Sequence, residues 1–350
     1  MKIGSKTIGA GRTYVIAEFG VNHNGSLERA KEGIIKAAQA GADAIKFQTY
    51  KADDLVVKGT PKFWKAESKV DEGLNQHEAY KALEGFKYEW YPELIDCCEE
   101  NGIEFLSTPF SFEAADFLDS IGMKAFKVAS SDMSTLPYLK HIARYGKPII
   151  LSTGASSMDE VKEAVRTIEN EGNENIIILH CTLCYPTQDK DANYNLIHTI
   201  KKEYPWYPVG ISDHTMGAFT STVAVAMGAE VVEKHFTVDK TLGMSADHWL
   251  SVDPTELKEI VDNARRIETL RGTTIKSVIP AEAATRLYDK RSIVAKVDIP
   301  AETQMTEDMV TYKRPGTGIL PKYLNRVLAK HSKEFIKADT ILEWHLFHQK

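Results

Sequence analysis

Short apolar segments alternate with amphipathic ones along most of this chain. Stretches with helical periodicity, such as 27–40, 158–171 and 255–270, follow apolar runs that end in polar or small residues. Runs without alternation are typical of parallel strands that are buried on both faces. Ser26 and Ser157 stand where helix N-caps are expected. The predicted strands are 14–20, 44–50, 104–109, 125–131, 148–154, 176–181, 208–215 and 231–237.

Eight such strand–helix repeats predict a (β/α)₈ barrel, which takes about 250 residues. A doubly wound open sheet is the competing fold, but no Gly-x-Gly-x-x-Gly motif follows the first strand. Pro280 and the small residues after it interrupt the pattern. We therefore expect a barrel domain over residues 1–280 and a linker with a small second domain over 281–350.

Composition narrows the class of protein. The 350 residues are 43% hydrophobic and 26% charged, with a net charge of −6, as in soluble globular proteins. The acidic total argues against nucleic-acid binding, and no apolar run is long enough to predict a membrane span. Four cysteines are too few for a disulfide framework, which favours the cytoplasm. Residues 281–350 carry 12 Lys and Arg against 9 Asp and Glu, so the negative charge belongs to the first domain.

The segment 51–79 is longer than an ordinary loop between a strand and a helix. It contains Trp64 and several charged residues. Two interpretations are open, a lid over the mouth of the barrel and a surface excursion without a role.

Polar side chains gather at the predicted strand ends, where the active sites of such barrels lie. Each residue alone has a structural explanation, since a buried lysine can pair with a glutamate across the barrel. Together, lysines and hydroxyls supply the donors that a phosphate and a carboxylate require. The residues at the strand ends include Glu18, Lys46, Gln48, Thr108, Lys127, Ser130, Asp132, Ser152, Tyr185, Ser212, Glu233 and Lys234.

His214 and His235 end neighbouring predicted strands, so their imidazoles can converge on one divalent metal. The alternative is a pair of hydrogen-bonded histidines at the rim. Cys181 and Cys184 have the spacing of half a zinc site or a redox pair, but the adjacent Cys97 and Cys98 do not complete it.

A series of motifs resembles the sialic acid synthase family, which condenses phosphoenolpyruvate with amino sugars to give nonulosonates. The resemblance runs in order through the whole predicted barrel and continues into an antifreeze-like (SAF) domain at the C-terminus. The motifs are AEFGVNHNGSLERA, AIKFQTYKADDL, FLSTPFS, FKVASSD, KPIILSTGAS, HCTLCYP, GISDHT and EKHFT in the barrel, and DKRSIVAKVDIP and KRPGTGILP beyond it.

The resemblance implies roles by position. It implies phosphoenolpyruvate binding by Lys46, Thr108, Lys127, Ser130, Ser152, Tyr185 and Ser212. His214 and His235 match metal ligands, usually for Mn²⁺, with Mg²⁺ or Co²⁺ as alternatives. Glu18, Gln48 and Asp247 match residues near the metal or the sugar. Arg314 matches an arginine that reaches the partner's barrel in a homodimer with swapped C-terminal domains.

The chain departs from the family pattern at three places. Asp132 stands where a glutamate is usual, so its role in proton transfer is open. Leu183 replaces a polar residue in HCTLCYP, and Ser245–His248 reads SADH in place of a GPDH-like stretch.

The predicted reaction joins C3 of phosphoenolpyruvate to the carbonyl of an open-chain aldose of the N-acetylmannosamine type. Lys46 and Lys127 neutralise phosphate and carboxylate, the metal polarises the aldose carbonyl, and Asp132 or Glu18 supplies the proton. Three alternatives remain: a synthase of a shorter deoxy-keto acid, a class I aldolase with a Schiff base on Lys127, and a non-enzymatic sugar-binding protein.

Overall fold

The computed structural model describes residues 1–64, 73–84, 87–242 and 247–348. The chain divides into two compact units, Met1–Gly272 and Thr273–Lys350, and each is described by itself. The helix that ends the first unit, α10 (Pro254–Arg271), begins with a capping box in which Asp253 and Glu256 each accept a backbone N–H.

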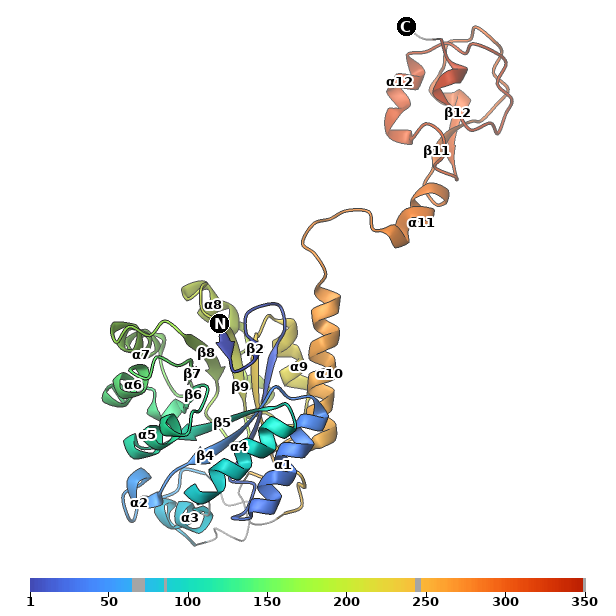
Figure 1. Ribbon diagram of the computed structural model, residues 1–350. Coiled ribbons are helices and arrows are strands. Elements are labelled where there is room, and N and C mark those ends of the chain that lie inside the picture. Colours follow the sequence, from blue (N-terminus) through green and yellow to red (C-terminus); the bar gives the residue numbers. More distant parts are fainter. Residues whose placement is uncertain (65–72, 85–86, 243–246, 349–350) are drawn as a thin grey trace. The chain divides into compact units, whose positions relative to one another are not determined.

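Eight parallel strands form the barrel of the first unit (Figure 1). Hydrogen bonds join them in the order β5-β4-β3-β10-β9-β8-β7-β6, and β5 also lies beside β6. The barrel is therefore nearly closed, and the predicted fold is confirmed. The strands are β3 (Tyr14–Gly20), β4 (Ala44–Thr49), β5 (Glu104–Pro109), β6 (Phe126–Val128), β7 (Ile149–Ser152), β8 (Ile176–Cys181), β9 (Val209–Asp213) and β10 (Val231–His235).

Helices surround the barrel and bury their apolar faces against the strands. Ser26 caps the first helix by accepting the Arg29 N–H, and Ser157 forms a capping box with Glu160, as their sequence positions predict. The helices are α1 (Leu27–Ala40), α4 (Tyr91–Glu100), α5 (Phe112–Ser120), α6 (Leu136–Ala143), α7 (Met158–Asn170), α8 (Asn195–Glu203), α9 (Phe219–Ala226) and α10.

The strand predicted over 125–131, the fourth of the barrel in chain order, is shorter in the structure. β6 ends at Val128, and a 3₁₀ turn over Ser130–Asp132 follows. Strict strand alternation would place Lys127 and Ser130 on opposite faces. Because the backbone turns after Val128, Lys127, Ser130 and Asp132 all reach the interior of the barrel mouth.

The chain between β4 and α4 contains two further helices, α2 (Ala52–Leu55) and α3 (Gln76–Leu83). They lie at the end of the barrel where the strands finish (Figure 1). Asn75 caps α3 in a capping box with Glu78. Part of the segment 51–79, residues 65–72, lies outside the described residues.

The opposite end of the barrel is closed by an N-terminal hairpin of β1 (Lys2–Ile3) and β2 (Lys6–Thr7). Ile3 and Ile8 are buried in one cluster with interior residues of the barrel. That cluster also contains Ile16, Leu106 and Leu179, so the hairpin completes the apolar lower half of the barrel core.

The second unit has its own small core. It contains α11 (Ala283–Tyr288), an antiparallel pair of β11 (Ser292–Ala295) and β12 (Val310–Lys313), and α12 (Leu324–Leu328). Isolated bridges such as Val294–Ile341 and Ile299–Ile336 tie the remaining chain to the pair.

None of the helices in the described part of the chain is both long and apolar enough to cross a membrane.

Replacing Ile3 by alanine should lower the free energy of unfolding by about 2–4 kcal/mol, because the hairpin then leaves a cavity in the barrel floor. Ile3 is 0% exposed. Urea unfolding followed by circular dichroism measures the change. The matched replacement of Ile35, which is 36% exposed on α1, should cost less than about 1 kcal/mol. Equal stability of Ile3→Ala and the wild type would contradict the role of the hairpin as a plug.

Candidate functional site

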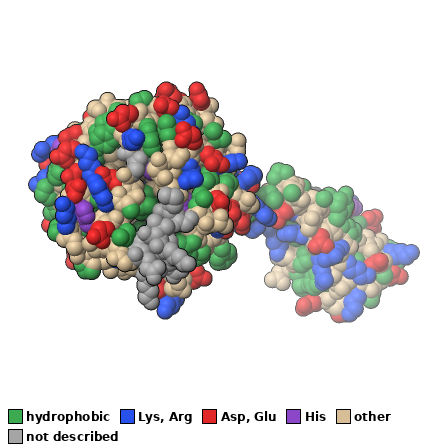
Figure 2. Space-filling model, turned by 90° about the horizontal axis from the view of Figure 1, so that it is seen from below, with side chains coloured by type: hydrophobic (Ala, Val, Ile, Leu, Met, Phe, Trp, Pro, Cys, Tyr) green, Lys and Arg blue, Asp and Glu red, His purple; other side chains and the backbone are tan. Residues whose placement is uncertain are grey.

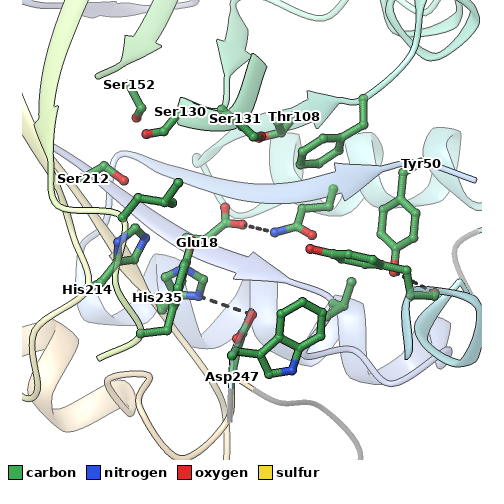
Figure 3. A pocket seen from close by; sticks show the side chains of 18 of the residues that line it. Glu18, Tyr50, Thr108, Ser130, Ser131, Ser152, Ser212, His214, His235 and Asp247 are labelled. Carbon is green, nitrogen blue, oxygen red and sulfur yellow. Dashed lines mark hydrogen bonds and ion pairs between the residues drawn. The ribbon is translucent and has the colours of Figure 1, made fainter. Parts of the chain in front are cut away.

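A cavity of about 470 Å³ opens at the carboxyl ends of the barrel strands. Figure 3 shows that its labelled polar side chains converge from different strands. On the outer surface around this end, basic and acidic side chains are interspersed over the described residues (Figure 2). The residues predicted from sequence that line the cavity are Glu18, Lys46, Gln48, Thr108, Lys127, Ser130, Asp132, Ser152, Tyr185, Ser212, His214, His235 and Asp247.

Four buried charges form the floor of the cavity. The Lys46 ammonium pairs with Glu18 and donates to Thr108 Oγ1 at 2.8 Å. Glu233 lies 3.9 Å from Lys46 Nζ and 3.7 Å from Lys127 Nζ. Because Lys46 and Lys127 come from β4 and β6, this carboxylate on β10 joins two sides of the barrel.

The two glutamates of the floor differ in acidity. Burial raises the pKa of Glu18, against the opposing effect of Lys46. Burial also acts on Glu233, but Lys127 and Lys46 together hold the pKa of this carboxyl below its usual value. Burial lowers the pKa of the Lys127 ammonium. The two lysines therefore favour the charged form of Glu233, while burial favours the protonated form of Glu18.

Three serine hydroxyls lie beside the lysines. Ser130 Oγ accepts the Gly154 N–H at 2.9 Å, and Ser212 Oγ donates to Glu233 at 2.9 Å. Ser152 Oγ is buried and has no hydrogen-bond partner among the described residues. An unpaired buried hydroxyl is unfavourable, so a polar ligand that accepts or donates a hydrogen bond here would be stabilised.

The two histidines lie next to each other at the ends of β9 and β10, with ring centroids 5.3 Å apart. His214 Nδ1 donates to the Thr182 carbonyl at 3.0 Å, which leaves Nε2 to face a ligand. Burial lowers the pKa of His235 well below its usual value, so this imidazole is neutral. Tyr185 packs on His214 at a centroid distance of 4.2 Å, and Asp247 Oδ2 lies 3.7 Å from His235 Nδ1.

Two further carboxyl groups of the cavity have a raised pKa. Burial raises the pKa of Asp132 to about 6, against the lowering effect of Lys127. Burial likewise raises the pKa of Asp247 to about 6. Groups that titrate near neutral pH can act as proton donors or acceptors in a reaction.

The side of the cavity opposite the serines is aromatic. Tyr50 lies across the cavity from Ser152, Ser212 and His214 (Figure 3). The centroid of its ring lies 5.6 Å from that of Tyr80, and the ring centroids of Trp64 and Tyr80 are 5.8 Å apart. Trp64 and Tyr80 belong to the long excursion after β4, so the described part of that excursion forms one wall of the cavity.

The sequence places Glu233 at a strand end but gives no sign that it belongs to the site. Its neighbour Lys234 points out of the barrel, where it pairs with Asp213 at 2.9 Å and donates to the Thr215 carbonyl at 2.6 Å. Adjacent strand residues face opposite sides, but the pattern of charges does not tell which of the two faces inward.

The cysteines form no disulfide, and all four are free thiols. Cys181 lies in the cavity wall with its Sγ 3.8 Å from His214 Nδ1, whereas Cys184 is exposed. Among the described residues, no group of three or more His, Cys, Asp or Glu side chains is placed to hold a metal.

Arg314 belongs to the second unit, where its guanidinium pairs with Asp289 at 2.7 Å. The stretch predicted to meet the sugar, 245–248, is described only from Asp247 onward.

These features define a (β/α)₈-barrel protein with a buried polar cavity at the carboxyl ends of its strands. Comparison with known proteins gives the family. The model of the NeuB family matches residues 33–276, and the SAF domain model matches residues 290–347. The chain belongs to the NeuB family.

Similar proteins cover nearly the whole chain. An uncharacterized protein of Methanocaldococcus jannaschii is 42% identical over 98% of this chain and 97% of its own length. N,N'-diacetyllegionaminic acid synthase of Legionella pneumophila is 39% identical over 97% of this chain and 96% of its own. The crystal structure of N-acetylneuraminic acid synthetase from Leptospira borgpetersenii matches with a TM-score of 0.73 and 33% identity, covering 81% of this chain and 94% of that one.

The Asp132→Asn variant should gain stability over the wild type as the pH rises from 5 to 8. A raised pKa means that the folded protein holds the proton more tightly than the unfolded chain. The stabilisation from this proton is complete below the unfolded pKa and is lost as the pH rises through about 6. Because Asp132 is only half-buried, the change is about 1 kcal/mol.

Urea unfolding at both pH values measures this difference. Asp308→Asn is the control, because a hydrogen bond from the Thr306 hydroxyl lowers the pKa of Asp308, so that its charge is constant over this range. A parallel pH response of the two variants would contradict the prediction.

Proposed function

We propose that this protein condenses phosphoenolpyruvate with an open-chain aldose of the N-acetylmannosamine type. The products are a nine-carbon 3-deoxy-2-keto acid, of the sialic or legionaminic type, and inorganic phosphate. The observation that carries this proposal is one cavity in which two buried lysines and three serines lie beside a pair of histidines. Similarity to synthases named for N,N'-diacetyllegionaminic and N-acetylneuraminic acid supports it.

Phosphoenolpyruvate is assigned to the serine and lysine side of the cavity. Lys46 and Lys127 neutralise its phosphate and carboxylate, and the unpaired hydroxyl of Ser152 gains a partner there. Thr108 and Ser130, with Ser212 and Tyr185, complete the set of donors around it. Binding in a buried site excludes bulk water and fixes the face of the enol that C3 presents.

The histidine pair fits a divalent metal, because His235 is neutral and the hydrogen bond of His214 Nδ1 leaves its Nε2 free for a ligand. Mn²⁺ is the metal that we propose, with Mg²⁺ or Co²⁺ as alternatives. When bound there, such a cation supplies Lewis-acid polarisation of the aldose carbonyl.

Carboxyl groups of the cavity are assigned the proton transfers of the reaction. C3 of phosphoenolpyruvate bonds to the aldose carbonyl carbon, and the carbonyl oxygen takes a proton from Glu18 or Asp132. Water adds to C2 and gives one proton to the carboxylate that protonated the aldose oxygen. As the bond between C2 and the phosphate oxygen breaks, the hydroxyl on C2 becomes the keto group and its proton leaves with the phosphate. Gln48, which donates to Glu18 Oε1 at 3.0 Å, orients that carboxyl, and Asp247 faces the sugar.

The second unit is proposed to act on a neighbouring barrel. A homodimer with swapped C-terminal domains would bring Arg314 to the partner's cavity, and the opposite charge balance of the two parts of the chain favours such docking. The four free thiols support a cytoplasmic location.

A class I aldolase is the second candidate, since burial lowers the pKa of Lys127 and so favours a neutral amine. Against it, Lys127 already donates to the Val128 carbonyl at 3.1 Å and lies beside Glu233. Borohydride with pyruvate would trap a Schiff base on Lys127, and we expect no adduct.

Removal of divalent metal should abolish the release of phosphate from phosphoenolpyruvate in the presence of N-acetylmannosamine-type aldoses. Adding Mn²⁺ back should restore it, with a product whose mass equals the nine-carbon keto acid. Phosphate assay and mass spectrometry measure both. Full turnover by a verified metal-free sample would overturn the role of the metal, and no phosphate release with any aldose would overturn the proposed reaction.

The aromatic side of the cavity bears on which group the aldose carries at C6, the end away from its carbonyl. An aldose with its carbonyl at the histidines extends away from phosphoenolpyruvate, toward Tyr50 and Tyr80. The basic residues among the described lining are Lys46 and Lys127, both at the floor. Burial, with Asp247 and Asp132, raises the pKa of Tyr80 to about 12, so a further anion is disfavoured at this end.

Three aldoses that differ only at C6 test this preference: N-acetylmannosamine, its 6-deoxy analogue and its 6-phosphate. We expect kcat/KM for the 6-phosphate to be about tenfold or more below the other two, because its phosphate would be desolvated beside the rings of Tyr50 and Tyr80, where the described lining has no lysine or arginine. Steady-state phosphate release measures all three. Preference for the 6-phosphate would contradict this assignment and leave the reaction itself intact.

A further inference from the structure

Two loops at the mouth of the barrel are joined by a cluster of buried polar side chains behind the cavity. One loop connects β3 to α1, and the other, residues 236–253, connects β10 to α10. The members of the cluster are the buried Asn22, Thr237, His248 and Ser251 and the half-buried Asn24, none of which lines the cavity.

The cluster holds the chain at the Asp247 carbonyl and at residues that follow it. The Ser251 hydroxyl donates to the Asp247 carbonyl at 2.6 Å, and the Ser251 N–H donates to the same oxygen at 3.1 Å. Asn22 Nδ2 reaches across from the other loop to Ser251 Oγ at 3.2 Å and to the Phe236 carbonyl at 2.8 Å. The backbone of Asp247 is therefore fixed from the side away from the cavity.

The residue after Asp247 is clamped as well. His248 is 1% exposed, and burial with nearby Arg29 lowers its pKa to about 4, so the imidazole is neutral. Its Nε2 lies 3.1 Å from Asn24 Oδ1, and its Nδ1 lies 2.7 Å from the Thr237 hydroxyl, which also donates to the Asp239 carbonyl at 3.1 Å. The imidazole is therefore held at both of its ring nitrogens.

Long loops lose much conformational entropy when they order, and the cluster supplies bonds that favour one arrangement of the described residues 236–242 and 247–253. We infer that Asn24 and His248, with Asn22 and Ser251, are positioning residues that fix the Asp247 carboxylate for the aldose. This inference rests on the proposed function, in which Asp247 faces the sugar.

The side chain of Asn24 can be removed without straining the backbone. Asn24 has φ +49°, a conformation that glycine adopts freely. Asn24→Gly should raise KM for the aldose about tenfold, the loss expected for one buried hydrogen bond. KM for phosphoenolpyruvate should stay within about twofold, since Asp247 does not lie among the lysines and serines that bind it.

Asn24→Asp keeps an oxygen that accepts the His248 N–H, so its KM for the aldose should return to near the wild-type value. Thr237→Val removes the other bond to the imidazole at similar volume and provides a second test should Asn24→Gly fail to fold. Asn173→Ala is the matched control. Asn173 is 2% exposed and donates to the Lys147 carbonyl at 2.9 Å, outside the cavity lining, so its loss should lower the melting temperature alone.

A double-mutant cycle separates positioning from a general loss of stability. If Asn24 acts through Asp247, then Asn24→Gly should have less than about a twofold effect on the aldose KM in an Asp247→Asn background. A lower melting temperature with an unchanged aldose KM, or an equal effect in both backgrounds, would overturn the inference. Failure of the wild type to consume phosphoenolpyruvate with any aldose would instead contradict the proposed function.

Discussion

The buried carboxylate of Glu233 is the group on which the rest of the site depends. Two ammonium groups inside a barrel are tolerated only beside a counter-charge, and Glu233 lies within 4 Å of both Lys46 and Lys127. These residues stand on β10, β4 and β6, which are not neighbours in the sheet. The three charges meet only when the barrel closes, so one interaction links the fold to the electrostatics of the cavity.

The cavity has two chemically different ends, and their separation matches the needs of a reaction between an anion and a sugar. The strand ends supply lysines and hydroxyls, whereas the excursion between β4 and α4 supplies the aromatic wall with Trp64 and Tyr80. The histidines lie on the serine side of the cavity, across from Tyr50 (Figure 3). An anion at one end and a sugar at the other would thus bring their reacting carbons together at the histidines.

Most of the fold could be predicted from local patterns, and the exceptions have local causes. The strand that ends at Val128 is short because the chain enters a 3₁₀ turn, which an apolar run does not reveal. The inward direction of Glu233, and not of Lys234, depends on the phase of β10 relative to β9 and β3. The bonds between Asn24 and His248 join positions more than 200 residues apart, beyond the reach of any periodicity.

The sequence by itself determined the number of the eight barrel strands and their order along the chain. It also determined the helix caps at Ser26 and Ser157 and the set of polar residues at the ends of the barrel strands. These follow from periodicity and capping, which act over a few neighbouring residues. Only the tertiary structure decided which of those groups share one cavity, which carboxylate balances the two lysines, and which loops are joined behind Asp247. The physical reason is that burial and charge pairing depend on distances set when the barrel closes.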